Sequence, residues 1–85
     1  MTHNHPQGGT FSYRDVMSAC LHQVQELRAV TPQNTFSLRG GTRKLNLETW
    51  TNVSRAVKRL GLTPENAHEV WKTVARENGL NYVVS

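Results

Sequence analysis

The chain has 85 residues, so it can form one small domain around one core. It carries 10 Lys and Arg against 6 Asp and Glu, a net charge of +4, and its 36% of apolar residues exclude a wholly disordered chain. A single cysteine excludes an internal disulfide and a cysteine-based zinc cage, and no apolar run approaches the roughly 20 residues of a membrane span, so we expect a cytoplasmic protein without a membrane partner.

The first ten residues have almost no apolar side chain, and they contain a proline and the pair Gly8-Gly9. Such a segment buries too little to offset the entropy lost on ordering. We therefore predict a disordered N-terminal arm over residues 1–10 and a single globular domain over residues 11–85. His3 and His5 form an H-x-H pair in this arm, but a solvated arm is the simpler interpretation, and we predict no metal site and no cofactor.

The first helix is predicted to begin after Ser12, which has the capping-box spacing to Asp15. Apolar residues then recur every three or four positions until Pro32, which is the pattern of one buried helical face. The helix is therefore predicted over residues 13–30. Cys20 lies in the centre of the apolar face, where a packing role is favoured over a catalytic thiolate.

After Pro32 the spacing of apolar residues changes from three or four positions to two. Phe36 and Leu38 alternate with polar residues, and Leu45 and Leu47 do so again after the pair Gly40-Gly41. Two glycines suit a two-residue turn, so we predict a short β-hairpin with Phe36 opposite Leu45. An irregular glycine-rich loop is the alternative.

Two further helices are predicted. The second begins after the cap residue Asn46 and ends at Gly61, in a left-handed conformation. The third follows the cap residue Thr63 and ends at Gly79, and the β-prone residues 80–85 can add a strand beside the hairpin. The predicted fold is mainly α: a small three-helix domain with a short β-hairpin between helices 1 and 2, a possible C-terminal strand, and a helix-turn-helix-like pair of helices 2 and 3.

Residues 53–72 resemble a helix-turn-helix motif. The matching positions are Val57, Gly61, Leu62, Ala67 and Val70. The resemblance implies that the third helix faces the DNA major groove, where Asn66 could read adenine, Lys72 could read guanine or bind a phosphate, and His68 shares the reading face. Three acidic residues on the same helix oppose this docking, because they repel phosphates.

The positive charge is concentrated between residues 39 and 59, where six basic residues face one acid, a net of +5. These six are Arg39, Arg43, Lys44, Arg55, Lys58 and Arg59. If the hairpin tip and the second helix share a face, the six cations form one patch that can follow a phosphate backbone.

The sequence therefore predicts a small non-catalytic nucleic-acid-binding module, DNA-binding and regulatory, that contacts phosphates through the hairpin tip and the second helix. No catalytic motif has the required spacing, so we predict no enzyme. The alternative is a protein-interaction module, an adaptor or inhibitor that docks on a larger macromolecular complex, with an acidic protein surface against the same basic face or with Trp50 or Trp71 as an exposed anchor. A two-fold homodimer is a third possibility.

Overall fold

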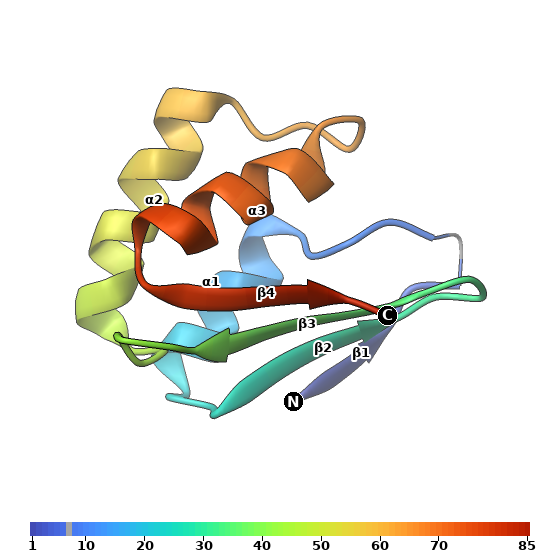
Figure 1. Cartoon of the computed structure of the whole chain (residues 1–85), viewed down its shortest axis with the longest axis horizontal. Coiled ribbons are helices and arrows are strands. Elements are labelled where there is room, and N and C mark those ends of the chain that lie inside the picture. Colours follow the sequence, from blue (N-terminus) through green and yellow to red (C-terminus); the bar gives the residue numbers. More distant parts are fainter. Residues whose placement is uncertain (7) are drawn as a thin grey trace.

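The structure, a computed structural model that describes residues 1–6 and 8–85, is a four-stranded sheet with three helices on one of its faces (Figure 1). In chain order the elements are β1 (Thr2–Asn4), α1 (Tyr13–Leu21), β2 (Glu26–Val30), β3 (Thr35–Gly40), α2 (Leu47–Leu60), α3 (Ala67–Glu77) and β4 (Leu80–Val84). The strand order is β1-β2-β3-β4, with β1 parallel to β2 and the other pairs antiparallel. The fold is α/β, and the prediction of a mainly α three-helix domain is wrong.

The predicted helix over residues 13–30 is divided into a helix and a strand. Helix α1 ends at Leu21, and Gln23 takes a left-handed φ of 51° that turns the chain back. Leu27 and Ala29 alternate with exposed residues in β2, and both are fully buried. The helical spacing in this segment comes from Val24, Leu27 and Val30, whereas Ala29 does not share a helical face with Leu27, and pairing with β3 makes the segment a strand.

The hairpin lies earlier in the chain than predicted. Strands β2 and β3 form it, with Val30 opposite Thr35, and a turn held by the hydroxyl of Thr31 connects them. Phe36 pairs with Ala29 and Val84 and not with Leu45, so the predicted register is wrong. The glycine pair 40–41 ends β3 without a positive φ angle and makes no hairpin turn.

The predictions for the start of the first helix and for both ends of the second helix are confirmed. The Oγ of Ser12 accepts from the N–H of Asp15 at 3.2 Å, and the Oδ2 of Asp15 accepts from the N–H of Ser12 at 3.0 Å, which confirms the capping box. Asn46 caps α2, and Gly61 ends it with a φ of 73°. These signals depend only on residues within one turn of each other. The predicted cap at Thr63 is wrong, because α3 begins after Asn66, which makes no side-chain cap hydrogen bond.

Helices α2 and α3 do not form the predicted helix-turn-helix pair. Residues 61–66 connect them, a longer link than the roughly three to four residues of that motif. Helix α3 begins at Ala67, and its apolar face packs into the core that it shares with the sheet. It is therefore a layer of an α/β fold and not a free reading helix.

The N-terminal segment is not the predicted disordered arm, because Thr2–Asn4 forms strand β1 at the edge of the sheet. The N–H of Arg28 donates to the carbonyl of Met1 at 2.9 Å, and the N–H of His5 donates to the carbonyl of Val30 at 2.8 Å. The prediction of disorder considered only how much apolar area the segment can bury. It did not consider backbone hydrogen bonds to the free edge of a strand. Gln7, which also belongs to the predicted arm, lies outside the described residues.

A buried tryptophan joins the helices to the start of α1. Trp71 is 1% exposed, and its Nε1–H donates to the carbonyl of Phe11 at 2.7 Å. Trp50 is only half-buried and meets the ring of Tyr13 edge-on at 4.8 Å between centroids. Cys20 is fully buried, as predicted for a packing residue, and burial raises the pKa of its thiol to about 11.

We expect Trp71→Phe to lower the free energy of unfolding by about 2 kcal/mol, because it leaves the buried carbonyl of Phe11 without its donor. Trp50→Phe is the matched control, and its half-buried position predicts a loss below about 1 kcal/mol. Urea denaturation followed by circular dichroism measures both. Equal losses in the two variants would contradict the role given to the Trp71 hydrogen bond.

Candidate nucleic-acid interface

Three adjoining hollows open where the end of β3, the loop after it, α2 and the C-terminal end of α3 come together. The first, of about 360 Å³, lies between α2 and the end of α3 and is lined by Arg43, Arg55 and Arg59 together with Glu77. The second, of about 450 Å³, shares Arg43 with the first. The third, of about 660 Å³, shares Arg39 with the second. The shared arginines make the three hollows one continuous surface.

We call this surface the basic surface. Its basic residues are Arg39, Arg43, Lys44, Arg55, Arg59, Lys72 and Arg76. These are seven of the ten Lys and Arg residues of the chain, whereas Glu77 is the one acid of six that lines the hollows. The surface thus carries a local net charge of +6 within a chain of net charge +4.

Acidic partners offset only part of this charge. The Nη2 of Arg59 lies 2.6 Å from the Oε1 of Glu77, in a solvent-exposed ion pair. On the outer face of the sheet Glu26 lies opposite Arg39. The hydroxyl of Ser37 donates to Glu26 at 2.6 Å and, with the nearby arginines, holds the pKa of this carboxyl below its usual value. The other basic side chains of the surface are exposed to solvent.

Two glycines bring the distant parts of the surface together. The N–H of Arg43 donates to the carbonyl of Gly79 at 3.2 Å, and a Cβ on Gly41 would lie 2.5 Å from that carbonyl oxygen. Gly79 has a φ of 66°, and a Cβ there would collide with the hydroxyl of Thr42. Only glycines allow this approach, which places the loop after β3 against the turn between α3 and β4.

The structure brings together five of the six cations of the predicted patch. Lys58 is the exception: it comes one residue before Arg59, about 100° around α2, and lines none of the three hollows found among the described residues. Two basic residues of the surface come from outside the predicted segment. Lys72 was predicted as a base reader, and Arg76 was not predicted at all. Residues 60–85 have a net charge of −1, and this average concealed both cations.

The other predicted base-reading residues lie elsewhere and have partners within the protein. The Oδ1 of Asn66 accepts from the N–H of Thr63, and its Nδ2 donates to the carbonyl of Gly61, both at 2.7 Å. The Nδ1 of His68 lies 3.0 Å from the hydroxyl of Tyr82 in β4. Neither Asn66 nor His68 lines the basic surface, so the structure does not assemble the predicted reading face.

A second cluster of polar side chains lies outside the basic surface. His3 and His5 meet Asp15 at the start of α1, and one ligand atom of each residue lies within 4.8 Å of the others. The sequence shows the H-x-H pair but not its carboxylate, because Asp15 reads as a helix cap. The prediction of a solvated arm missed this cluster.

No protein-family model, curated protein or solved structure matches the chain. Within the described residues, each helix is too short or too polar to cross a membrane.

We expect Gly79→Ala to lower the free energy of unfolding by about 3 kcal/mol, because the new Cβ combines an unfavourable φ with a collision at Thr42. Gly61→Ala is the control, since Gly61 has a similar φ of 73° with no atom within 4 Å of the added Cβ. Its expected cost is about 1 kcal/mol. Chemical denaturation of both variants checks the difference, and equal costs would show that the loop and turn do not meet closely.

Proposed function

We propose that this protein is a small non-catalytic module that binds the phosphate backbone of DNA through the basic surface, in a regulatory role. The observation that carries the proposal is the gathering of seven basic residues around three connected hollows with one acid among them. Phosphate contacts by Arg and Lys supply most of the affinity of sequence-independent DNA binding. The proposal includes a cytoplasmic location. In cells without a nucleus, such modules meet DNA there.

The character of the basic surface favours a nucleic acid over an acidic protein. Protein interfaces usually place aromatic or large apolar side chains at their centre. Trp71 is buried in the core, and Trp50 is half-buried against Tyr13; neither lines the three hollows, so neither is an anchor within the basic surface. Among the described residues, Val83 is the single large exposed apolar side chain that lines the surface.

The proposed binding is weakly selective for sequence. Asn66 and His68 make hydrogen bonds within the protein. The proposal therefore does not include the reading of bases by α3. The arginine side chains can each grip a phosphate with two N–H groups and need no particular base. Shape and charge of the backbone therefore define the ligand.

The proposal predicts salt-dependent binding to a fluorescein-labelled DNA duplex of about 20 base pairs, measured by anisotropy. With five to seven phosphate contacts, log K is expected to fall against log salt with a slope of about −4.5 to −6.3. Arg43→Gln removes a cation shared by two hollows, so it is expected to weaken binding about fivefold at about 100 mM salt and to reduce the slope by about 1.

Arg14→Gln is the charge-matched control, because Arg14 is exposed on α1 and outside the basic surface. We expect it to change the affinity less than about twofold, and the same of Lys58→Gln. Undetectable binding at about 25 mM salt, or equal effects of Arg14→Gln and Arg43→Gln, would refute the proposal. Recovery of one stoichiometric acidic protein from nuclease-treated lysate, with no DNA binding, would favour the adaptor alternative. The homodimer stays a prediction that the mass in solution decides.

A further inference from the structure

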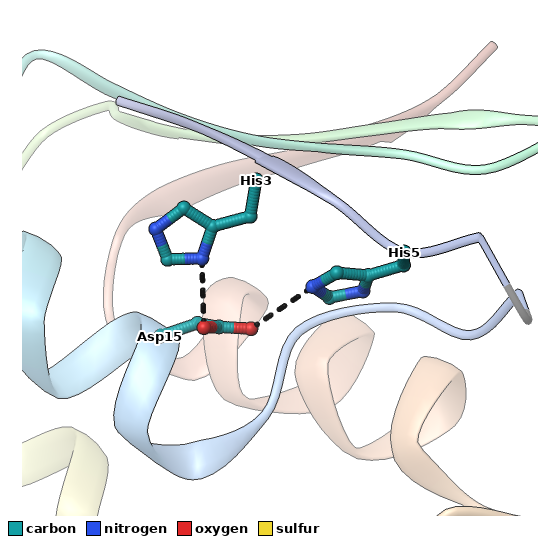
Figure 2. A group of neighbouring side chains, drawn as sticks. All are labelled: His3, His5 and Asp15. Atoms are coloured by element: carbon teal, nitrogen blue, oxygen red, sulfur yellow. Dashed lines mark hydrogen bonds and ion pairs between the residues drawn. The ribbon is translucent and has the colours of Figure 1, made fainter.

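Three potential metal ligands converge between the N-terminal strand and the first helix (Figure 2). The Nδ1 of His3 lies 2.8 Å from the Oδ1 of Asp15, and the Nε2 of His5 lies 3.4 Å from the Oδ2 of the same carboxylate. The three side chains are partly buried, with 33%, 19% and 15% of their surfaces exposed in the order His3, His5, Asp15. They are held in place and remain open to an ion from solvent.

The ring of His5 is oriented by a hydrogen bond on its far side. Its Nδ1 lies 3.2 Å from the carbonyl of Gly9, which can only accept, so Nδ1 carries the proton. In the neutral ring the Nε2 lone pair then faces the carboxylate of Asp15. Two electron-rich atoms that face each other need a cation between them or a proton on the ring. A carbonyl partner on the second nitrogen is also the usual arrangement of a metal-bound histidine.

The carboxylate is oriented in the same way. The N–H of Ser12 donates to the Oδ2 of Asp15 at 3.0 Å, which fixes the side chain at the start of α1. A free aspartic acid has lost its proton well below neutral pH. Asp15 is therefore an anionic oxygen donor at neutral pH.

We propose that His3, His5 and Asp15 form a binding site for one divalent transition-metal ion, with zinc as the ion to test. Two imidazole nitrogens and one carboxylate oxygen suit such ions, and water can complete the coordination. With zinc bonds of about 2.0–2.1 Å, the ligand atoms of a tetrahedral site lie about 3.3 Å apart. The two distances to the Asp15 oxygens, 2.8 and 3.4 Å, lie on either side of this value.

A bound ion would fasten β1 to α1. His3 belongs to β1 and His5 follows it, whereas Asp15 lies in the first turn of α1. Strand β1 contributes only three residues at the edge of the sheet, so a second attachment would stabilise it strongly. This site shares no residue with the basic surface and is independent of the proposed DNA binding.

The test is isothermal titration of the metal-free, full-length chain with zinc chloride at neutral pH. We expect one zinc per chain and, at about a hundredfold excess over the dissociation constant, a rise in Tm of roughly 10–20 °C. His5→Asn and Asp15→Asn should each weaken zinc binding at least about tenfold, and an asparagine at position 15 can still accept the capping hydrogen bond. Amide exchange in β1 should slow when zinc is added.

His22→Asn is the control, because His22 is exposed at the far end of α1, and we expect it to bind zinc as the unmodified chain does. Absence of 1:1 zinc binding in the folded chain would overturn the proposal. So would unchanged affinity in both Asp15→Asn and His5→Asn, even if His3→Asn abolished binding, since the ion would then be held by His3 and the terminal amine. Circular dichroism of each variant separates lost ligands from lost folding.

Discussion

The close backbone contact between Gly41 and Gly79 is the constraint on which the basic surface depends. It joins the loop after β3 to the turn between α3 and β4, two segments separated by almost half the chain. Arg39 and Arg43 come from β3 and the loop after it, on one side of this contact, and Lys72 and Arg76 come from α3, on the other side. Together with the pairing of β3 and β4, this contact places the cations of α3 beside those of the loop.

The core makes this contact durable. One face of the sheet is covered by the helices, and α3 lies against it through Val70, Trp71 and Val74. The hydrogen bond from Trp71 to Phe11 connects α3 to the residue before the α1 cap, so the helices and the N-terminal segment hold one arrangement. Both candidate sites use this rigidity: the basic surface needs α3 in place, and the His3–His5–Asp15 cluster needs the start of α1 in place.

Some features of the fold were predictable because their causes are local. The capping box at Ser12, the cap at Asn46 and the left-handed Gly61 each involve residues within one turn. The helix over residues 13–30 was predicted too long, because Val24, Leu27 and Val30 keep the helical spacing, whereas it is Leu27 and Ala29 that are buried, as in a strand. Pairing of β2 with β1 and β3 decides this case, and apolar spacing within the segment does not contain that pairing.

The candidate sites divide in the same way. Charge counted along the chain located Arg39, Arg43, Lys44, Arg55 and Arg59, because they are neighbours in sequence. The same count missed Lys72 and Arg76, because they lie in a segment of negative net charge. Asp15 was predicted only as a helix-capping residue, so its contact with His3 and His5 was missed.

By itself, the sequence determined the caps of α1 and α2, the buried Cys20 and the concentration of charge between residues 39 and 59. The tertiary structure alone decided that the fold is α/β, which cations share a surface and which carboxylate the histidines meet. The physical reason is that caps and local charge arise from neighbours, whereas sheets and sites arise from chain segments that only folding brings together.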